Sequence, residues 1–101
     1  MNPSNRRDKM FFDVTEAQYI ENYRIMLSFE DGATGIADLS DYPNENNVFR
    51  PFLDMNYFKD FRIEYGTIIW GNGELDIAPE TLYTIATGKP IRYNFIKSPT
   101  V

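Results

Sequence analysis

The fourteen residues from Trp70 to Tyr83, Trp-Gly-Asn-Gly-Glu-Leu-Asp-Ile-Ala-Pro-Glu-Thr-Leu-Tyr, constrain the fold more than any other part of this chain. They combine the apolar end of a strand, an acidic turn and the start of a helix. Pro79 suits the first position of a helix, because an N–H group at that position has no partner within the helix. Glu80 beside it complements the positive end of the helix dipole. The segment therefore predicts a strand that ends with Trp70 in the core and a helix that begins at Pro79.

Two hairpins are predicted from the alternation of apolar and polar residues. In the first hairpin, the apolar face of the leading strand consists of Tyr23, Ile25, Leu27 and Phe29. The dipeptide Asp31-Gly32 is expected to make a tight turn in which both central residues tolerate positive φ, and residues 33–39 then return antiparallel. Residues 61–70 alternate in a similar way and turn at Gly66, which predicts the second hairpin.

The remaining segments predict one more strand and two helical elements. A first strand is expected over residues 10–17, and residues 48–58 form an irregular helical stretch in which Asp54 caps a short turn. The last helix runs from Pro79 to about residue 87, and Gly88 can adopt the left-handed conformation that ends it. The predicted fold is α+β: a curved antiparallel sheet of two hairpins plus an N-terminal strand, with a short irregular helical segment and one C-terminal helix.

A length of 101 residues predicts a single domain, large enough to bury a core without a disulfide or a metal. We expect residues 1–9 to be a frayed polar tail and residues 10–88 to be the folded body. Residues 89–101 are expected to form a C-terminal tail. Partial alternation from Ile91 to Lys97 indicates that this tail could add an edge strand or dock on a partner.

The composition argues against several classes of function. The chain has no cysteine and no histidine, so it lacks thiolate ligands and the most common general base and transition-metal ligand. Its four serines therefore have no histidine to activate them, and we expect no enzymatic activity, no cofactor and no transition-metal site. No apolar run approaches the roughly 20 residues needed to cross a bilayer, and no secretory signal is recognisable. We therefore expect a cytoplasmic protein without membrane contact.

The net charge of −5 conceals an uneven distribution along the chain. Between residues 10 and 88, fourteen acidic residues face four basic ones, whereas the segments before and after carry net charges of +2 and +3. An acidic body repels phosphate, so nucleic acid is not expected as a direct partner unless the basic ends converge. A basic protein is the better electrostatic match.

Three acidic side chains, Glu74, Asp76 and Glu80, could gather near the start of the last helix, and hard cations prefer oxygen ligands. Their spacing is not that of a calcium loop. Capping of the helix by Asp76 and pairing of Glu80 with the helix dipole account for two of the three without a metal. The sequence Gly71-Asn-Gly73 invites a nucleotide-binding interpretation, but the third glycine is absent and acidic residues follow.

Two other groups of residues are candidates for function. Asp38 and Asp41 could flank a substrate bond as paired carboxylates, although fifteen carboxylates make chance pairs easy. Aromatic residues make up 16% of the chain and concentrate at Phe49, Phe52, Tyr57 and Phe58. An aromatic patch bordered by acidic residues would suit a protein interface, with Phe49 and Tyr57 as contact residues. The alternative, which we favour for Phe52 and Phe58, is that the stretch closes one end of the sheet.

Several short motifs resemble those of one family of small bacterial domains. They are Phe29-Glu-Asp-Gly32, Asp38-Leu39, Phe58-x-x-Phe61, Ile68-Ile-Trp70, Asp76-Ile-Ala-Pro-Glu80 and Leu82-Tyr83. The sequence resembles the family called domain of unknown function 2442 over residues 12–86. The resemblance implies an α+β fold with a curved antiparallel sheet and short helices, and no catalytic residue. It also implies an accessory binding role, since some relatives carry a helix-turn-helix domain and others are encoded in pairs that look like toxin and antitoxin.

We therefore expect a non-catalytic interaction module that binds a basic protein, with an antitoxin-like role in a two-gene pair implied by the resemblance. One alternative is a transcription-related accessory domain whose basic tails touch nucleic acid. Another is a small-ligand or metal-binding domain that uses the acidic turn of residues 74–80.

Overall fold

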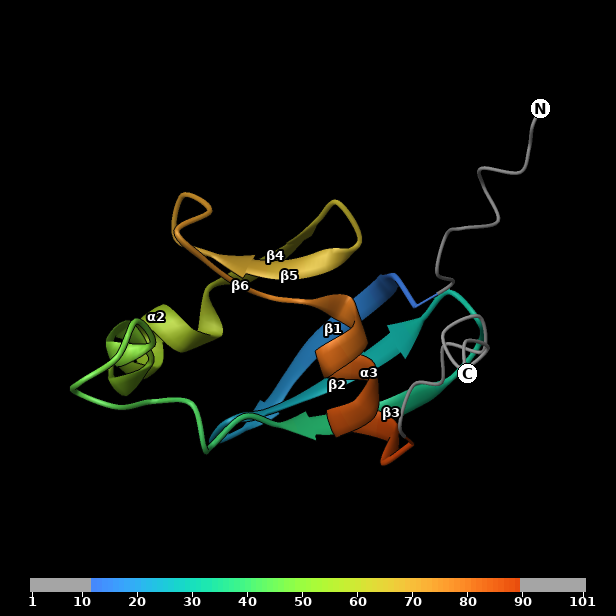
Figure 1. Cartoon of the computed structure of the whole chain (residues 1–101), viewed down its shortest axis with the longest axis horizontal. Helices are drawn as coiled ribbons and strands as arrows, with labels where there is room; N and C mark the ends of the chain where they lie inside the picture. Colours follow the sequence, from blue (N-terminus) through green and yellow to red (C-terminus); the bar gives the residue numbers. More distant parts are fainter. Residues whose placement is uncertain (1–11, 90–101) are drawn as a thin grey trace, which may run out of the picture.

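The computed structural model describes residues 12–89, which form two three-stranded antiparallel sheets, two short helical turns and one longer helix (Figure 1). The elements are β1 (Val14–Glu21), β2 (Arg24–Phe29), β3 (Thr34–Asp38), the 3-10 helix η1 (Arg50–Leu53), α2 (Met55–Lys59), β4 (Phe61–Glu64), β5 (Thr67–Trp70), β6 (Leu75–Ile77) and α3 (Pro79–Thr87). The strand orders are β1-β2-β3 and β4-β5-β6. The predicted α+β class is confirmed, and the two predicted hairpins lie in different sheets. The predicted N-terminal tail, residues 1–9, lies outside the described residues, and so does the predicted C-terminal tail, residues 89–101, except for Lys89.

Two details of the first sheet differ from the predictions. The first strand spans residues 14–21 rather than 10–17, and residues 10 and 11 lie outside the described part. The register of β1 against β2 shifts between Val14 and Glu16 and again between Tyr19 and Glu21. Because each irregularity resets the alternation of side chains, the period of two was a poor guide to the limits of this strand.

The turn between β2 and β3 is also longer than predicted. The N–H of Phe29 donates to the carbonyl of Ala33 at 2.9 Å, and this bond encloses three residues, 30–32, rather than two. Only Gly32 among them has a positive φ, at 93°, and the Asp31 carboxylate accepts a hydrogen bond from the N–H of Ala33 at 2.8 Å. Asp31 therefore shapes the turn through its side chain and not through a left-handed backbone.

Strand β6 was not predicted. Residues 75–77 pair with β5, with Leu75 opposite Trp70 and Asp76 opposite Ile69. Asp76 is exposed in this strand, and the residue that caps α3 is Ala78, whose side chain makes no capping bond. The predicted capping by Asp76 was therefore wrong, because pairing with β5 holds this residue two positions before the helix cap.

Helix α3 covers one face of the first sheet (Figure 1). Pro79 occupies its first turn and Gly88 ends it with φ at 75°. Leu82 and Tyr83 are buried on the side of the helix that faces the sheet. The closest approach is at Gly35 in β3, where a Cβ atom would collide with the carbonyl group of Ala86. Only a residue without a side chain allows the helix to lie this close to the strand.

Trp70 joins the second sheet to the helical segment and is completely buried. Its indole Nε1–H donates to the carbonyl of Phe58 at 2.8 Å, and its ring centroid lies 4.6 Å from that of Phe52. Tyr23 extends the cluster to the first sheet: its ring lies 4.8 Å from Phe58, and its hydroxyl donates to the carbonyl of Phe52 at 2.8 Å. Both halves of the molecule therefore depend on one aromatic cluster.

Replacing Trp70 by alanine should destabilise the protein by roughly 3 to 5 kcal/mol, because the change leaves a large cavity and an unpaired carbonyl at Phe58. Urea denaturation followed by circular dichroism measures the effect. The matched control is Tyr65→Ala, since Tyr65 is 96% exposed and should tolerate the change within about 0.5 kcal/mol. An unchanged midpoint for Trp70→Ala would contradict the role assigned to the cluster.

Candidate interaction surface

The three acidic residues singled out in the sequence do not converge. Glu74 lies in the turn between β5 and β6, Asp76 is exposed in β6, and Glu80 is half-buried in the first turn of α3. Among residues 12–89, no group of three or more acidic side chains lies close enough together to hold a metal ion. The arrangement in the described part of the chain thus offers no candidate cation site.

Glu74 instead accepts hydrogen bonds from its own turn and from a neighbouring tyrosine. Its carboxylate accepts hydrogen bonds from the hydroxyl of Tyr57 at 3.2 Å and from the N–H of Asn72 at 3.1 Å. Burial raises the pKa of Tyr57, and the hydrogen bond to Glu74 and the negative charge of its carboxylate raise that pKa further. The sequence singled out Glu74 as a possible cation ligand and Tyr57 as a contact residue of an aromatic patch, and the structure brings the two into direct contact.

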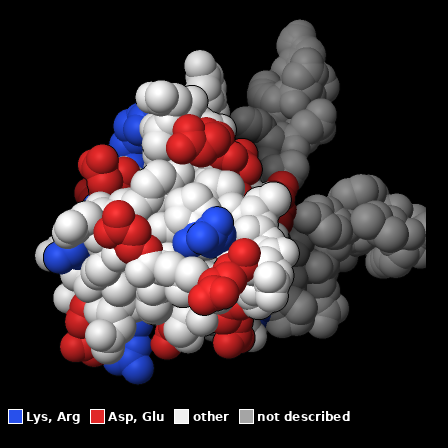
Figure 2. All heavy atoms as spheres, turned by 90° about the vertical axis from the view of Figure 1, so that its left-hand side faces the viewer, with Lys and Arg blue, Asp and Glu red and all other residues white. Residues whose placement is uncertain are grey.

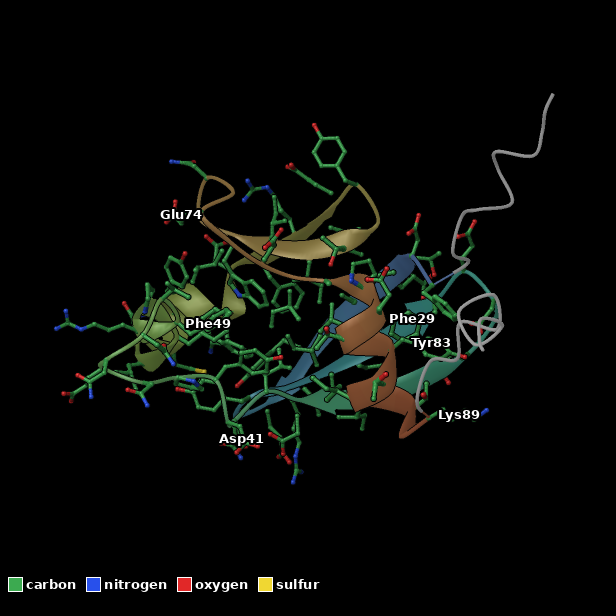
Figure 3. All side chains as sticks on the ribbon, in the orientation of Figure 1. Phe29, Asp41, Phe49, Glu74, Tyr83 and Lys89 are labelled. Atoms are coloured by element: carbon green, nitrogen blue, oxygen red, sulfur yellow. The ribbon has the colours of Figure 1, made fainter. Side chains whose placement is uncertain are left out.

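Phe49 packs inward at the same end of the molecule (Figure 3). Its ring centroid lies 4.9 Å from that of Tyr42 and 5.2 Å from that of Phe52, and its side chain is half-buried. Phe52 and Phe58 are completely buried, as expected for a stretch that closes the end of the sheet. Most of the aromatic surface here is already used within the chain.

Asp38 and Asp41 are both exposed. The Asp38 carboxylate accepts a hydrogen bond from the N–H of Ser40 at 3.0 Å and lies 3.4 Å from Nε of Arg24. Hydrogen bonds from Ser40, and to a lesser degree the Arg24 guanidinium, lower the pKa of Asp38. A carboxyl group with a lowered pKa is poorly suited to hold a proton as a general acid.

Sequence reasoning missed a second surface, the face of the first sheet opposite α3, which we call the outer face. Residues paired across antiparallel strands project to the same side, and this face has three such rows. They are Glu16–Ser28–Thr34, Gln18–Met26–Ile36 and Glu21–Arg24–Asp38. The alternation in β2 contained the signal, because Arg24, Met26 and Ser28 lie opposite its buried residues.

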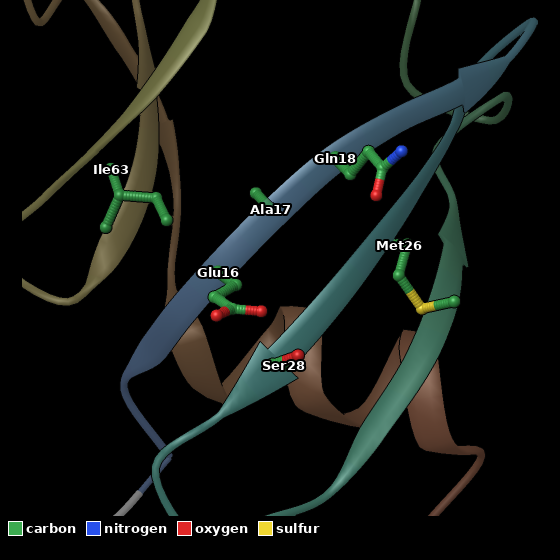
Figure 4. A pocket seen from close by; sticks show the side chains of 6 residues that line it. All are labelled: Glu16, Ala17, Gln18, Met26, Ser28 and Ile63. Atoms are coloured by element: carbon green, nitrogen blue, oxygen red, sulfur yellow. The ribbon is translucent and has the colours of Figure 1, made fainter.

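The outer face has an apolar centre and a polar border. Ile36 is 45% exposed and Ile20, in the irregular part of β1, is 42% exposed. Ile63 of β4 lies beside β1, and together with Met26 it lines an open groove of about 480 Å³ (Figure 4). Such a centre with polar residues around it is the usual anatomy of a protein interface.

The border of the outer face is mainly acidic. At one end of the sheet Glu16 lines the groove, and at the other Glu21 and Asp38 flank Arg24, whose guanidinium lies 2.8 Å from Glu21. Acidic side chains also outnumber basic ones at the end of the molecule that carries η1 and α2 (Figure 2). Residues 12–89 include fourteen acidic and five basic residues, and none of the fourteen acidic side chains is buried.

A family model described as "Protein of unknown function (DUF2442)" matches residues 14–88, which include every strand and helix described above. The chain belongs to this family. No curated protein matches the chain, and no solved structure does. Within the described residues of this DUF2442 protein, α3 is the longest helix, and none of the helices has the length and apolar character needed to span a membrane.

Replacing Glu74 by glutamine should lower the pKa of Tyr57, because the negative charge that disfavours the phenolate is lost. The pKa should stay above the ordinary value near 10, since burial is the larger cause of the shift. A pH titration of the Tyr57 ring signals by NMR measures this. Asp76→Asn is the control and should leave the Tyr57 titration unchanged; an equal response in the two variants would disprove the contact.

Proposed function

We propose that this DUF2442 protein is a non-catalytic interaction module that binds a basic protein partner, as the antitoxin-like member of a two-gene pair. The observation that carries the proposal is the outer face, where an apolar centre is exposed within an acidic border. The excess of acidic residues over the folded body supports the sign of the partner's charge.

The two properties of the outer face have different roles in binding. Burial of Met26, Ile36 and Ile63 supplies most of the affinity, because removal of apolar surface from water is the main favourable term in association. The acidic border accelerates encounter with a basic partner and disfavours acidic ones. Binding is therefore expected to weaken with salt without disappearing.

The test uses the product of the adjacent gene as the partner. The two proteins are co-expressed and purified through a tag on the DUF2442 protein, and the complex is measured by size-exclusion chromatography at low and high salt. A stable complex at low salt supports the proposal. Its absence at low salt overturns the proposal for that partner, and salt-sensitive binding to duplex DNA in its place would favour the accessory nucleic-acid role.

The variant Ile36→Lys should weaken the complex by roughly tenfold or more, because it places a positive charge in the apolar centre of the surface that meets a basic partner. Isothermal titration calorimetry measures the affinity. Tyr65→Lys adds the same charge at an exposed position in the turn between β4 and β5, outside the rows of the outer face, and should have little effect. Equal weakening by the two variants would show that general charge, and not the outer face, governs binding.

A further inference from the structure

Strand β3 has one edge without a partner strand among residues 12–89. The N–H of Phe29 bonds to the carbonyl of Ala33, and the N–H of Leu39 bonds to the carbonyl of Tyr23. These two bonds define which residues of β3 face β2. Alternate residues of a strand direct their backbone groups to opposite edges. The N–H and C=O groups of Gly35 and Ala37 therefore point toward β2, and those of Thr34, Ile36 and Asp38 point toward the free edge. The outward N–H and C=O groups form a template for one more strand.

The chain leaves its last helix at this edge. Helix α3 packs mainly on β3, with Ala86 directly against Gly35, and its end passes β3 where the described chain stops at Lys89 (Figures 1 and 3). Twelve residues follow in the sequence, from 90 to 101. At about 3.3 Å per residue, seven of them are sufficient to span the five residues of β3.

We propose that residues 91–97 pair with the free edge of β3 as a fourth strand of the first sheet. Their sequence, Ile-Arg-Tyr-Asn-Phe-Ile-Lys, is rich in β-branched and aromatic residues and alternates over its first five positions. With Ile91, Tyr93 and Phe95 on the side of α3, Arg92 and Asn94 join the outer face. The pairing would satisfy backbone groups that otherwise invite association with other chains.

Charge favours this segment as the occupant. Between Arg24 and Arg50 the chain has five acidic residues and no basic one, and four of the five lie in or next to β3 and its two flanking turns. The segment that follows α3 carries three basic residues, Lys89, Arg92 and Lys97, within nine positions. An acidic edge and a basic segment attract each other, and the attraction is intramolecular.

A second copy of the chain fits this edge less well. Two β3 strands paired antiparallel in one sheet would lie about 4.8 Å apart, whereas packed helices need about 8 to 10 Å between their axes. Because α3 lies over β3 itself, two helices on the same face would be brought too close. A single extended segment without a helix avoids this conflict.

Native-state amide hydrogen exchange on the full chain tests the proposal. The amides of Thr34, Ile36 and Asp38 should exchange at least tenfold more slowly than in an unstructured peptide, and those of Gly35 and Ala37 report the β2 side as an internal reference.

The variants Tyr93→Pro and Asn94→Pro each remove one N–H from the proposed strand, and successive N–H groups point to opposite sides. At least one of the two should reduce protection of the three outward amides by tenfold or more, with Gly35 and Ala37 unchanged. Unprotected outward amides in the full chain, or protection that both proline variants leave intact, would overturn the proposal.

A disulfide test separates pairing within one chain from pairing between chains, because the natural sequence has no cysteine. The double variant Ile36→Cys with Asn94→Cys should form an intramolecular disulfide under mild oxidation and remain a monomer on a non-reducing gel. The control pair, Tyr65→Cys with Asn94→Cys, should not, since Tyr65 lies in the turn of the other sheet. A dimer whose yield rises with protein concentration would assign the edge to a second copy and contradict the proposal.

Discussion

The contact between Trp70 and the segment formed by η1 and α2 holds this small domain together. The two sheets share no strand, and the cluster fixes one relative to the other together with a direct contact of β1 with β4 and β5, where the N–H of Val14 donates to the carbonyl of Gly66 at 2.8 Å. The indole ring and its bond to Phe58 anchor the second sheet, and Tyr23 reaches the same cluster from the first sheet. Aromatic residues provide this efficiently, because each buries a large area with few rotatable bonds. The aromatic content that suggested an interface is thus largely a requirement of the fold.

The first sheet consequently has two faces with different roles. One face is covered by α3 and belongs to the core, whereas the outer face remains open with Met26, Ile36 and Ile63 near its centre. An antiparallel sheet commonly has one solvated face, but that face is usually polar. Exposed Ile36, half-buried Met26 and Ile63, and their acidic border are therefore the features that support the proposal of a protein partner.

The sequence was most informative where structure is determined locally. The second hairpin follows from the alternation around Gly66, and the limits of α3 follow from Pro79 and Gly88. Strand β6 was missed because its three residues owe their conformation to pairing with β5, and nothing within the segment itself distinguishes a short strand from an acidic turn. For the same reason Asp76 was assigned to the helix cap.

The candidate surface was less predictable than the fold. Glu74 and Tyr57 were selected by residue type, and their hydrogen bond to each other depends on how the turn after β5 meets α2. The outer face requires knowledge of which residues of three strands share a row, and the irregularities in β1 prevent that register from being read along the chain. The outer face could therefore not be predicted from the sequence, because it depends on long-range strand pairing that local patterns do not encode.

The glycine at position 35 also has a consequence for the uniqueness of the sheet. A slip of β3 by one residue against β2 would replace Gly35 beneath Ala86 by a threonine or an isoleucine, and the helix would have to lift away from the strand. The same slip would turn Ile36 inward and Ala37 outward. The missing side chain thus restricts the register of the first sheet, because only the alignment that places Gly35 beneath Ala86 leaves room for α3 to pack on β3.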